Sequence, residues 1–265
     1  MSEKLRSLAE AAALVKSGAI LALGGMTLYR RPVAFVFELL RRTPPPRDLT
    51  LLCFTAGYES DLLVGAGSVK RVRTCYFGFE VFGLAPMFTR AGNLGEIEIT
   101  EESEASLTYG LRAALAGIGF MPGRAWMGTD LLRLRPDVRT VRDPYSGEEL
   151  AAFPALHPDV AVIHALQADR AGNAVIGRNM GVDPELALAA EIVIVTTEEI
   201  VEDLSRADIV APLVTAVVEA PRGAWPTSCH PLYPVAGGEI LKYLEACGRE
   251  AFDEYLKERL EAERK

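Results

Sequence analysis

Two adjacent glycines followed by two arginines form the first group of residues that could do chemistry. Gly24 and Gly25 come directly after the apolar run of residues 19–23. Because glycine accepts positive φ and has no Cβ, its main-chain N–H groups can face an anion, and nearby arginines add positive charge. A plain turn from strand to helix, with solvated arginines, is the simpler explanation of the pair taken alone. The candidate binding residues of this loop are Gly24, Gly25, Met26, Thr27, Arg30 and Arg31.

An acidic group forms the second candidate site. Glu101, Glu102 and Glu104 follow an expected strand at residues 95–100 and precede an expected helix. A glutamate with like-charged neighbours or in a buried position has a raised pKa and can act as a general base. Carboxylates in a first helical turn also favour the helix dipole, so ordinary N-terminal charge is the alternative. Glu101 and Glu104 are the candidate catalytic residues of this chain.

The remaining polar candidates lie in loops or in the core. Residues 117–156 contain four prolines and form an expected long excursion, and its polar residues are candidates for lining a ligand pocket. His164 lies in an expected buried strand, where a hydrogen-bonded core histidine is the simpler interpretation. The adjacent Ser228, Cys229 and His230 do not predict a nucleophilic dyad. The pocket candidates of the excursion are Arg124, Gly128, Thr129 and Asp130.

Neither metal binding nor a disulfide framework is expected. The four cysteines are scattered without a Cys-x-x-Cys pair, and no two histidines have the spacing of metal ligands. We therefore expect no metal and no tightly bound cofactor.

Strands and helices alternate along the chain, which predicts parallel β-α-β units. Ser7 and Glu10 have capping-box spacing, Pro32 is suited to the first turn of a helix, and Asp183 to an N-cap. Strands are expected at residues 19–23, 49–54, 72–79, 95–100, 159–166 and 192–196. The expected fold is α/β, with a largely parallel sheet flanked by helices in one domain, residues 1–265, interrupted by the excursion at about 117–156.

Composition limits the classes of partner. The chain has 265 residues, 49% of them hydrophobic, and a formal net charge of −8. The negative charge argues against general affinity for nucleic acid, and no basic block predicts a membrane-binding patch. The first 18 residues are amphipathic and charged, unlike a signal peptide, so a cytoplasmic location is expected.

Five sequence blocks in order resemble one enzyme family. The segment SGAILALGGMTLYRRP resembles the first signature of class I coenzyme A transferases, with Ser17, Met26 and Arg30 in place of the usual acidic or amide residue, phenylalanine and glycine. Four further blocks, through about Thr197, resemble the alpha-type (A-type) subunits of the glutaconate CoA-transferase group. They are DLTLLCFTAGYESDLLVGAG, LRAALAGIGFMPGRAWMGTDLL, DPYSGEELAAFPAL and PDVAVIHALQADRAGNAVIG.

The resemblance implies a fold, a reaction and a partner. The fold is the one shared by CoA transferases and certain sugar-phosphate isomerases. In the family, a glutamate attacks an acyl-CoA thioester, giving an acyl-glutamyl anhydride and then an enzyme-CoA thioester. That glutamate belongs to a Ser-Glu-Asn-Gly-type motif of a second subunit, and no such tetrapeptide occurs here. This chain would then be the alpha subunit, with a beta-type partner, an acyl-CoA and a small carboxylic acid as its other components.

Three alternatives remain open from the sequence. Some members of the group resemble hydrolases of cyclic diketone CoA thioesters in steroid breakdown, where Glu101 would be the base and Glu104 the second choice. A ligand-sensing module on the same scaffold would need the pocket but no nucleophile. A sugar-phosphate isomerase complete in one chain is the third, and the five blocks argue against it.

Overall fold

The computed structural model describes residues 4–248 and 251–262. Its main sheet has eight strands, seven of them parallel in the order β11-β10-β8-β1-β2-β3-β4, and β9 pairs with β8 in the antiparallel sense. The strands of this sheet are β1 (Ile20–Leu23), β2 (Leu49–Ala56), β3 (Val69–Phe77), β4 (Glu98–Glu101), β8 (Val160–Asp169), β9 (Ala174–Val175), β10 (Ile192–Val201) and β11 (Ala216–Glu219).

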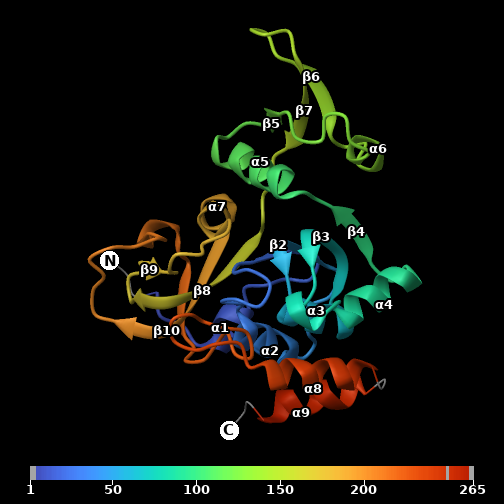
Figure 1. Ribbon diagram of the computed structural model, residues 1–265. Coiled ribbons are helices and arrows are strands. Elements are labelled where there is room, and N and C mark those ends of the chain that lie inside the picture. The colour runs from blue at the N-terminus through green and yellow to red at the C-terminus, as the bar shows by residue number, and fades with distance from the viewer. Residues whose placement is uncertain (1–3, 249–250, 263–265) are drawn as a thin grey trace.

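Helices cover both faces of this sheet. Their bounds are α1 (Leu8–Ala12), α2 (Val33–Arg41), α3 (Tyr58–Gly65), α4 (Pro86–Leu94), α5 (Glu104–Leu115), α6 (Leu131–Leu134), α7 (Asp183–Ala189), α8 (Gly237–Gly248) and α9 (Phe252–Ala262), with short 3-10 turns η1 (Glu80–Phe82) and η2 (Ala211–Leu213). In Figure 1, α1, α2 and α3 lie below the sheet, α5 and α7 lie above it, and α8 and α9 form a further layer at the bottom. None of the helices in the described ranges is long and apolar enough to cross a bilayer.

Alternation along the strands fixes which face each side chain takes. Leu21 and Leu23 pack into the core under α1, α2 and α3, whereas Ala22 between them packs into the core under α5 and α7. Val162 and Ile163 of β8 divide in the same way. Successive side chains of a strand point to opposite faces, so an unbroken apolar run is needed where helices cover both.

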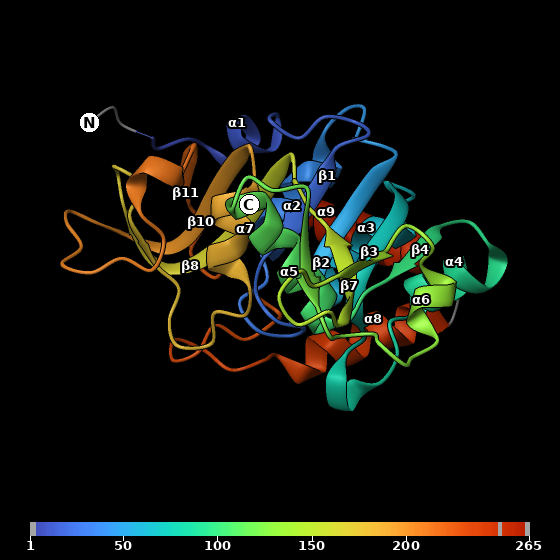
Figure 2. The same cartoon turned by 90° about the horizontal axis from the view of Figure 1, so that it is seen from above.

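The strand order reverses beside β1, and this determines where a ligand can bind. From β1 the chain proceeds outward through β2, β3 and β4, and it then returns to β8 on the other side of β1. The helices that follow β1 and β8 therefore diverge. In open parallel sheets such a switch point leaves a crevice beyond the carboxyl ends of the two strands, which is the usual ligand site. Figure 2 shows the loops that follow β1, β3 and β11 gathered on one side of the molecule, low in the view.

The excursion at residues 117–156 is more regular than the sequence indicated. Three short antiparallel strands, β5 (Phe120–Gly123), β6 (Arg139–Arg142) and β7 (Glu149–Pro154), form a separate small sheet in the order β5-β7-β6. This small sheet rises beyond α5, away from the main sheet (Figure 1). The sequence did not predict these strands, because β5 and β7 contain Pro122 and Pro154 and prolines are uncommon in strands.

A buried carboxylate ties the C-terminal helices to the domain. Asp61 of α3 accepts hydrogen bonds from the N–H groups of Met87 and Phe88 in the first turn of α4, and from the Tyr243 hydroxyl of α8 at 2.6 Å. Burial raises the pKa of Asp61 to about 6, although these hydrogen bonds oppose the rise. One side chain thus links three helices.

The strands and helices expected from the sequence are confirmed within a few residues, but two cap assignments are wrong. Ser7 and Glu10 do form the expected capping box. Pro32 lies at the N-cap of α2 rather than in its first turn. Asp183 lies inside the first turn of α7, with Val182 at the N-cap, because the Asp183 carboxylate binds groups outside its own helix.

Candidate active site

A cavity opens beside the switch point, at the carboxyl edge of the main sheet. Its volume is about 520 Å³, and four chain segments line it. Tyr29 comes from the loop after β1 and Leu166 from the second half of β8. The lining residues are Tyr29, Leu166, Gly177, Arg178, Asn179, His230 and Pro231. The cavity therefore lies where the topology predicts a ligand site.

The glycine pair binds an anion, but that anion belongs to the chain itself. The Gly25 N–H donates to the Asp183 carboxylate at 2.9 Å. A Cβ on Gly24 would lie 2.8 Å from the Asp183 Oδ1 atom, and one on Gly25 would lie 2.5 Å from the Arg30 carbonyl oxygen. The expectation that Gly24 and Gly25 offer bare main chain to a ligand is therefore wrong, since Asp183 fills that place.

Arg30 pairs with the same carboxylate and does not face the cavity. Its side chain is fully buried, and its guanidinium donates to Asp183 at 2.7 Å, to the His164 carbonyl oxygen at 2.7 Å and to the Asn179 carbonyl oxygen at 3.1 Å. The expected role in ligand binding is corrected to one of support, because Arg30 holds the Asn179 segment of the cavity wall. Its φ of 56° lies in the region that favours glycine, the residue usual here in the family signature.

Arg31 is also buried in an ion pair. It donates to Glu59 from Nη2 at 2.5 Å and from Nε at 2.9 Å, and to the carbonyl oxygens of Gly25 and Thr55. Burial alone would lower the pKa of Arg31, but Glu59 raises it above its ordinary value. Every nitrogen of the buried Arg31 guanidinium has an acceptor in the protein, so its expected role in ligand binding is likewise corrected to one of support.

The other two residues of the loop are supporting residues as well. The N–H of Thr27 donates to the Thr55 hydroxyl at 2.9 Å, and Thr27 is buried. Met26 is half-buried and packs against Gly181. Of this loop, Tyr29 is the residue that lines the cavity.

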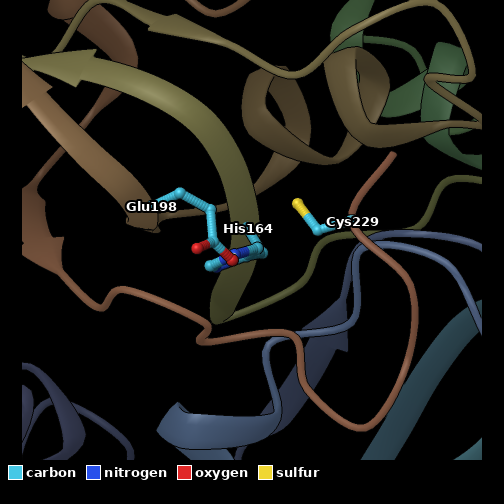
Figure 3. Close-up of side chains that lie close together, drawn as sticks. All are labelled: His164, Glu198 and Cys229. Atoms are coloured by element: carbon cyan, nitrogen blue, oxygen red, sulfur yellow. The ribbon is translucent and has the colours of Figure 1, made fainter. Parts of the chain in front are cut away.

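A buried polar network supports the wall that carries His230 and Pro231. His164 of β8 bonds to the Thr196 hydroxyl through Nδ1 at 2.9 Å and to Glu198 of β10 through Nε2 at 2.8 Å. Glu198 also accepts hydrogen bonds from the Tyr233 hydroxyl and the Arg222 N–H. In Figure 3 the Glu198 carboxylate lies against the His164 ring, and Cys229 approaches from the neighbouring loop. The interpretation of His164 as a hydrogen-bonded core residue fits this geometry.

The surroundings of Cys229 do not favour its use as a nucleophile. Burial, together with the nearby Glu198, raises the pKa of the Cys229 thiol to about 12, so the thiol stays protonated at neutral pH. His164, Glu198 and Cys229 offer ligand atoms within 4.8 Å of one another. However, both ring nitrogens of His164 and the Glu198 carboxylate already have protein partners. The arrangement is a hydrogen-bonded brace between two strands and a loop.

Replacing His164 with glutamine tests this hydrogen-bond network through the pH dependence of the unfolding free energy. Burial lowers the pKa of His164, against the opposing effect of Glu198, so below pH about 6.5 the unfolded chain takes up a proton that the folded chain refuses. We expect the variant to lose about 1–3 kcal/mol of unfolding free energy at pH 7.5. The wild-type advantage over the variant should shrink as the pH falls from 7 to 5, measured by urea denaturation.

The difference in unfolding free energy between wild type and His164→Gln isolates His164 from other groups that titrate in this pH range. The pKa of Asp61 is raised to about 6, so its contribution to the unfolding free energy becomes more favourable as the pH falls. In the unfolding free energy of wild type alone, this effect opposes that of His164. The exposed His157 provides the control, since His157→Gln removes no buried contact and should leave the unfolding free energy at pH 7.5 nearly unchanged. A wild-type advantage that stays constant from pH 7 to 5 would contradict the neutral, buried state of His164.

The acidic candidates lie at the same edge of the sheet but away from the cavity. Glu101 pairs with Thr74 of β3, which pairs with Cys53 of β2, so Glu101 is level with the end of β1. Three strand spacings separate them, roughly 14 Å. Glu101 and Glu104 are both exposed. Within this chain they therefore lack the burial that a general base needs, and they stay a prediction for the assembled protein.

The excursion candidates do not line the cavity, and the excursion contacts Glu101 through Arg135. Arg135, just after α6, donates to the Glu101 carbonyl oxygen and pairs with the buried Glu102. Arg124 forms a two-bond ion pair with Glu148 and is largely exposed. The remaining candidates, Gly128, Thr129 and Asp130, lie between Trp126 and α6 in the same loop. The structure thus separates the predicted site residues into a buried group at β1 and an exposed group at β4.

Several cavity residues escaped the sequence analysis. Gly177, Arg178 and Asn179 follow β9 in a segment bounded by two glycines, Gly177 and Gly181, both with positive φ. That glycine-bounded loop with polar residues was the available signal. Leu166 and Pro231 carried none, since an apolar strand residue and a loop proline are common everywhere.

Comparison with known proteins agrees with the fold. The family model for coenzyme A transferase matches residues 5–220. The A-type subunit of 3-oxoadipate CoA-transferase from Pseudomonas knackmussii is 37% identical over 83% of this chain and 79% of its own length. An uncharacterized Archaeoglobus fulgidus protein is 38% identical over 97% of this chain, which spans 60% of that protein's length. The chain belongs to the coenzyme A transferase family.

Other relatives show the range of the family. The cholesterol ring-cleaving hydrolase IpdA subunit of Rhodococcus jostii is 35% identical over 84% of this chain and 79% of its own length. The crystal structure of glutaconate CoA-transferase from Acidaminococcus fermentans matches with a TM-score of 0.89 and 32% identity, over 96% of this chain and 88% of that one. The crystal structure of a variant of the decarboxylase AibA/AibB matches with a TM-score of 0.91 and 34% identity, over 98% and 99%. The expected family, fold and alpha type are confirmed.

Proposed function

We propose that this chain is the alpha subunit of a CoA-transferase and that a beta-type partner supplies the nucleophilic glutamate. The supporting observation is a cavity at the switch point of the main sheet in a chain 37% identical to the A-type subunit of a CoA-transferase. In this proposal the cavity of about 520 Å³ receives the acyl part of the thioester. Coenzyme A acts as a substrate, so the reaction needs no tightly bound cofactor, and the cytoplasmic location stays a prediction.

The residues of this chain would bind and orient the acyl group. Tyr29 and Asn179 line the cavity and can donate hydrogen bonds from a hydroxyl and an amide. A fixed donor aimed at the developing oxyanion is worth about 3–4 kcal/mol in other acyl-transfer sites. The Gly25 N–H is not such a donor, because Asp183 already holds it. Leu166 and Pro231 add apolar surface that excludes water from the acyl chain.

The reaction then divides into attacks on two carbonyl carbons. The partner's glutamate attacks the thioester, releasing CoA thiolate and forming an acyl-glutamyl anhydride. The thiolate attacks the glutamyl carbonyl, giving an enzyme-CoA thioester and the free acid, and a second acid reverses both steps. These reaction steps require the alpha subunit to provide a cavity that holds the acid while CoA moves from the acyl group to the glutamate.

Hydrolysis with Glu101 as base is the second candidate, and one observation favours it. A relative 35% identical to this chain is named as a ring-cleaving hydrolase subunit. Glu101 is exposed at the carboxyl edge of the sheet, where a partner subunit could bury it. Transfer and hydrolysis then differ in the acceptor, a carboxylic acid or water. A sensing module is the third candidate and predicts ligand binding without turnover.

Coexpression with a beta-type partner subunit separates the candidates. The assembled protein is incubated with a panel of acyl-CoA thioesters, with and without acceptor acids, as wild type and as Glu101→Gln. We expect labelled CoA to pass to the acceptor acid, with the rate changed less than about tenfold by Glu101→Gln.

Each other outcome removes a part of the proposal. Release of free acid alone, lost in Glu101→Gln, would replace transfer with hydrolysis. Loss of carbon dioxide from the acyl group would place the chain with the decarboxylase that shares its fold. Binding without any turnover would leave the sensing module. Glu98→Gln, an exposed residue of the same strand paired with Arg71, is the matched control and should leave every rate unchanged.

A further inference from the structure

A second cavity lies on the side of the main sheet that α1 and α2 cover (Figure 1). Its volume is about 480 Å³, and α1, α2, α9 and the loop after β11 line it. Its lining residues differ from those of the first cavity, the one lined by Tyr29 and Leu166. The second cavity is therefore separate from the site proposed for the acyl group.

Arginines dominate the charge of the second cavity. Arg41, Arg222 and Arg259 line it, together with one acidic residue, Glu219. In a chain whose formal net charge is −8, this group is a local concentration of positive charge. The second cavity therefore favours an anionic ligand.

Arg222 presents its guanidinium to this cavity. Its side chain is exposed and lies over the Tyr233 ring at 5.2 Å, and it has no hydrogen bond or ion pair with any residue in 4–248 or 251–262. Its φ of 57° is unusual for a residue other than glycine, and its main-chain N–H donates to Glu198 at 2.5 Å. Main chain held in such a conformation is concentrated at ligand sites. Arg222 is thus fixed at its backbone, while its guanidinium is available to a ligand.

Neighbouring groups hold the other two arginines in place. Arg41 pairs with Glu38 at 3.2 Å and donates from Nε to the Leu260 carbonyl oxygen at 3.1 Å. The guanidinium of Arg259 lies 4.7 Å from the centre of the Trp225 ring. Both side chains therefore keep their positive charges at fixed positions in the cavity wall, which lowers the entropy cost of binding.

The rest of the lining suits a planar aromatic group attached to a sugar. Trp225 is half-buried and contributes its indole, and Leu8 and Ala34 add apolar surface. Indole rings stack on planar bases, and such stacking is sequence-tolerant because every base has a π-face. The exposed Glu219 carboxylate can accept hydrogen bonds from sugar hydroxyls.

We propose that the second cavity binds a nucleoside diphosphate, with its phosphates at Arg222 and the other two arginines and its base at Trp225. Guanidinium groups bind phosphate oxygens through paired, charge-assisted hydrogen bonds. The volume of about 480 Å³ lies in the range of small-molecule sites. Binding here does not depend on the reaction proposed for the first cavity. An adenosine diphosphate group occurs free and at one end of coenzyme A, so the two sources need separate tests.

Calorimetry on the full chain with ADP, pyrophosphate and adenosine tests the site. We expect ADP to bind at least about tenfold more tightly than pyrophosphate or adenosine, because ADP alone engages both the arginines and Trp225. Arg222→Met should lower the affinity for ADP by about 10- to 100-fold, and Arg222→Lys should keep part of it. Arg178→Met, which removes an exposed arginine of the first cavity, is the matched control and should leave ADP binding unchanged.

Competition with coenzyme A separates the two sources of the nucleotide. CoA that displaces ADP, and that loses affinity in Arg222→Met as ADP does, would identify the nucleotide end of CoA as the ligand. CoA that leaves ADP in place would identify a free nucleotide. Either result supports the nucleotide site.

Three results would overturn the inference. Equal affinities for ADP and pyrophosphate would reduce the second cavity to a general anion site. A loss of ADP binding in Arg178→Met but not in Arg222→Met would place the nucleotide in the first cavity. Failure of ADP to bind at millimolar concentration would remove the nucleotide site altogether.

Discussion

Asp183→Asn is expected to lower the unfolding free energy by about 3–5 kcal/mol, because it leaves the buried guanidinium of Arg30 without its counter-charge. Both side chains of this pair are essentially inaccessible, at 0% and 1% exposure. Asparagine keeps the shape and can still accept from the Gly25 N–H, so the loss isolates the charge. Urea denaturation gives the value from the midpoint and slope.

The same helix offers the matched control for this effect. Glu185 lies two residues further along α7 and pairs with Arg112, whose side chain is 54% exposed. Surface pairs contribute about 0–1 kcal/mol, so Glu185→Gln should be nearly neutral. The double change Arg30→Met with Asp183→Leu removes both charges and should cost less than Asp183→Asn alone. Equal losses for Asp183→Asn and Glu185→Gln would contradict the buried pair.

Gly25→Ala is the second change with a large expected effect. Gly25 has a φ of 80°, and an added Cβ would lie 2.5 Å from the Arg30 carbonyl oxygen and 2.6 Å from that of Tyr29. Main-chain strain of about 1–2 kcal/mol and overpacking of about 1–3 kcal/mol add together here. We expect a loss of about 2–5 kcal/mol, with a lower affinity for ligands in the adjoining cavity.

Gly18→Ala separates the two causes of that loss. Gly18 has almost the same φ, 81°, yet an added Cβ would meet nothing within 4 Å. Its alanine variant should therefore show the main-chain strain alone, about 1–2 kcal/mol. If both variants lost the same unfolding free energy, close packing around Gly25 would not contribute to the loss in Gly25→Ala.

The sheet could be predicted from the sequence because its signals are local. Residues 19–23 and 159–166 are short apolar runs, and burial on both faces demands such runs. The strands of the excursion gave no such signal, since β5 is exposed over most of its length and contains Pro122. The β11 strand is four residues long and follows several loops, so neither length nor alternation distinguished it.

The site was harder to predict because its contacts join distant parts of the chain. The glycine pair was expected to face an anionic ligand, with nearby arginines adding positive charge. The carboxylate that fills the place comes from Asp183, 158 residues away, and nothing near Gly25 indicates it. Glu59 likewise pairs with Arg31 across 28 residues. The sequence therefore predicted that Arg30 and Arg31 were available to a ligand, whereas each forms a buried ion pair.

The cavity itself arises from four segments that only folding brings together. Tyr29, Leu166, Arg178 and His230 are separated by up to 201 residues, as in the contact between the Tyr29 hydroxyl and the His230 carbonyl oxygen. The family resemblance pointed to the loop after β1, and Tyr29 of that loop lines the cavity. It did not identify most of the lining residues, because those come from β8 and from the loops after β9 and β11.

The structure of the assembled enzyme with a bound acyl-CoA is the most direct test of this account. We expect the acyl group in the cavity between Tyr29, Leu166 and Asn179, with its thioester carbonyl facing a glutamate supplied by the beta-type partner. An acyl group seated elsewhere, with this cavity empty or filled by the partner's side chains, would contradict the account.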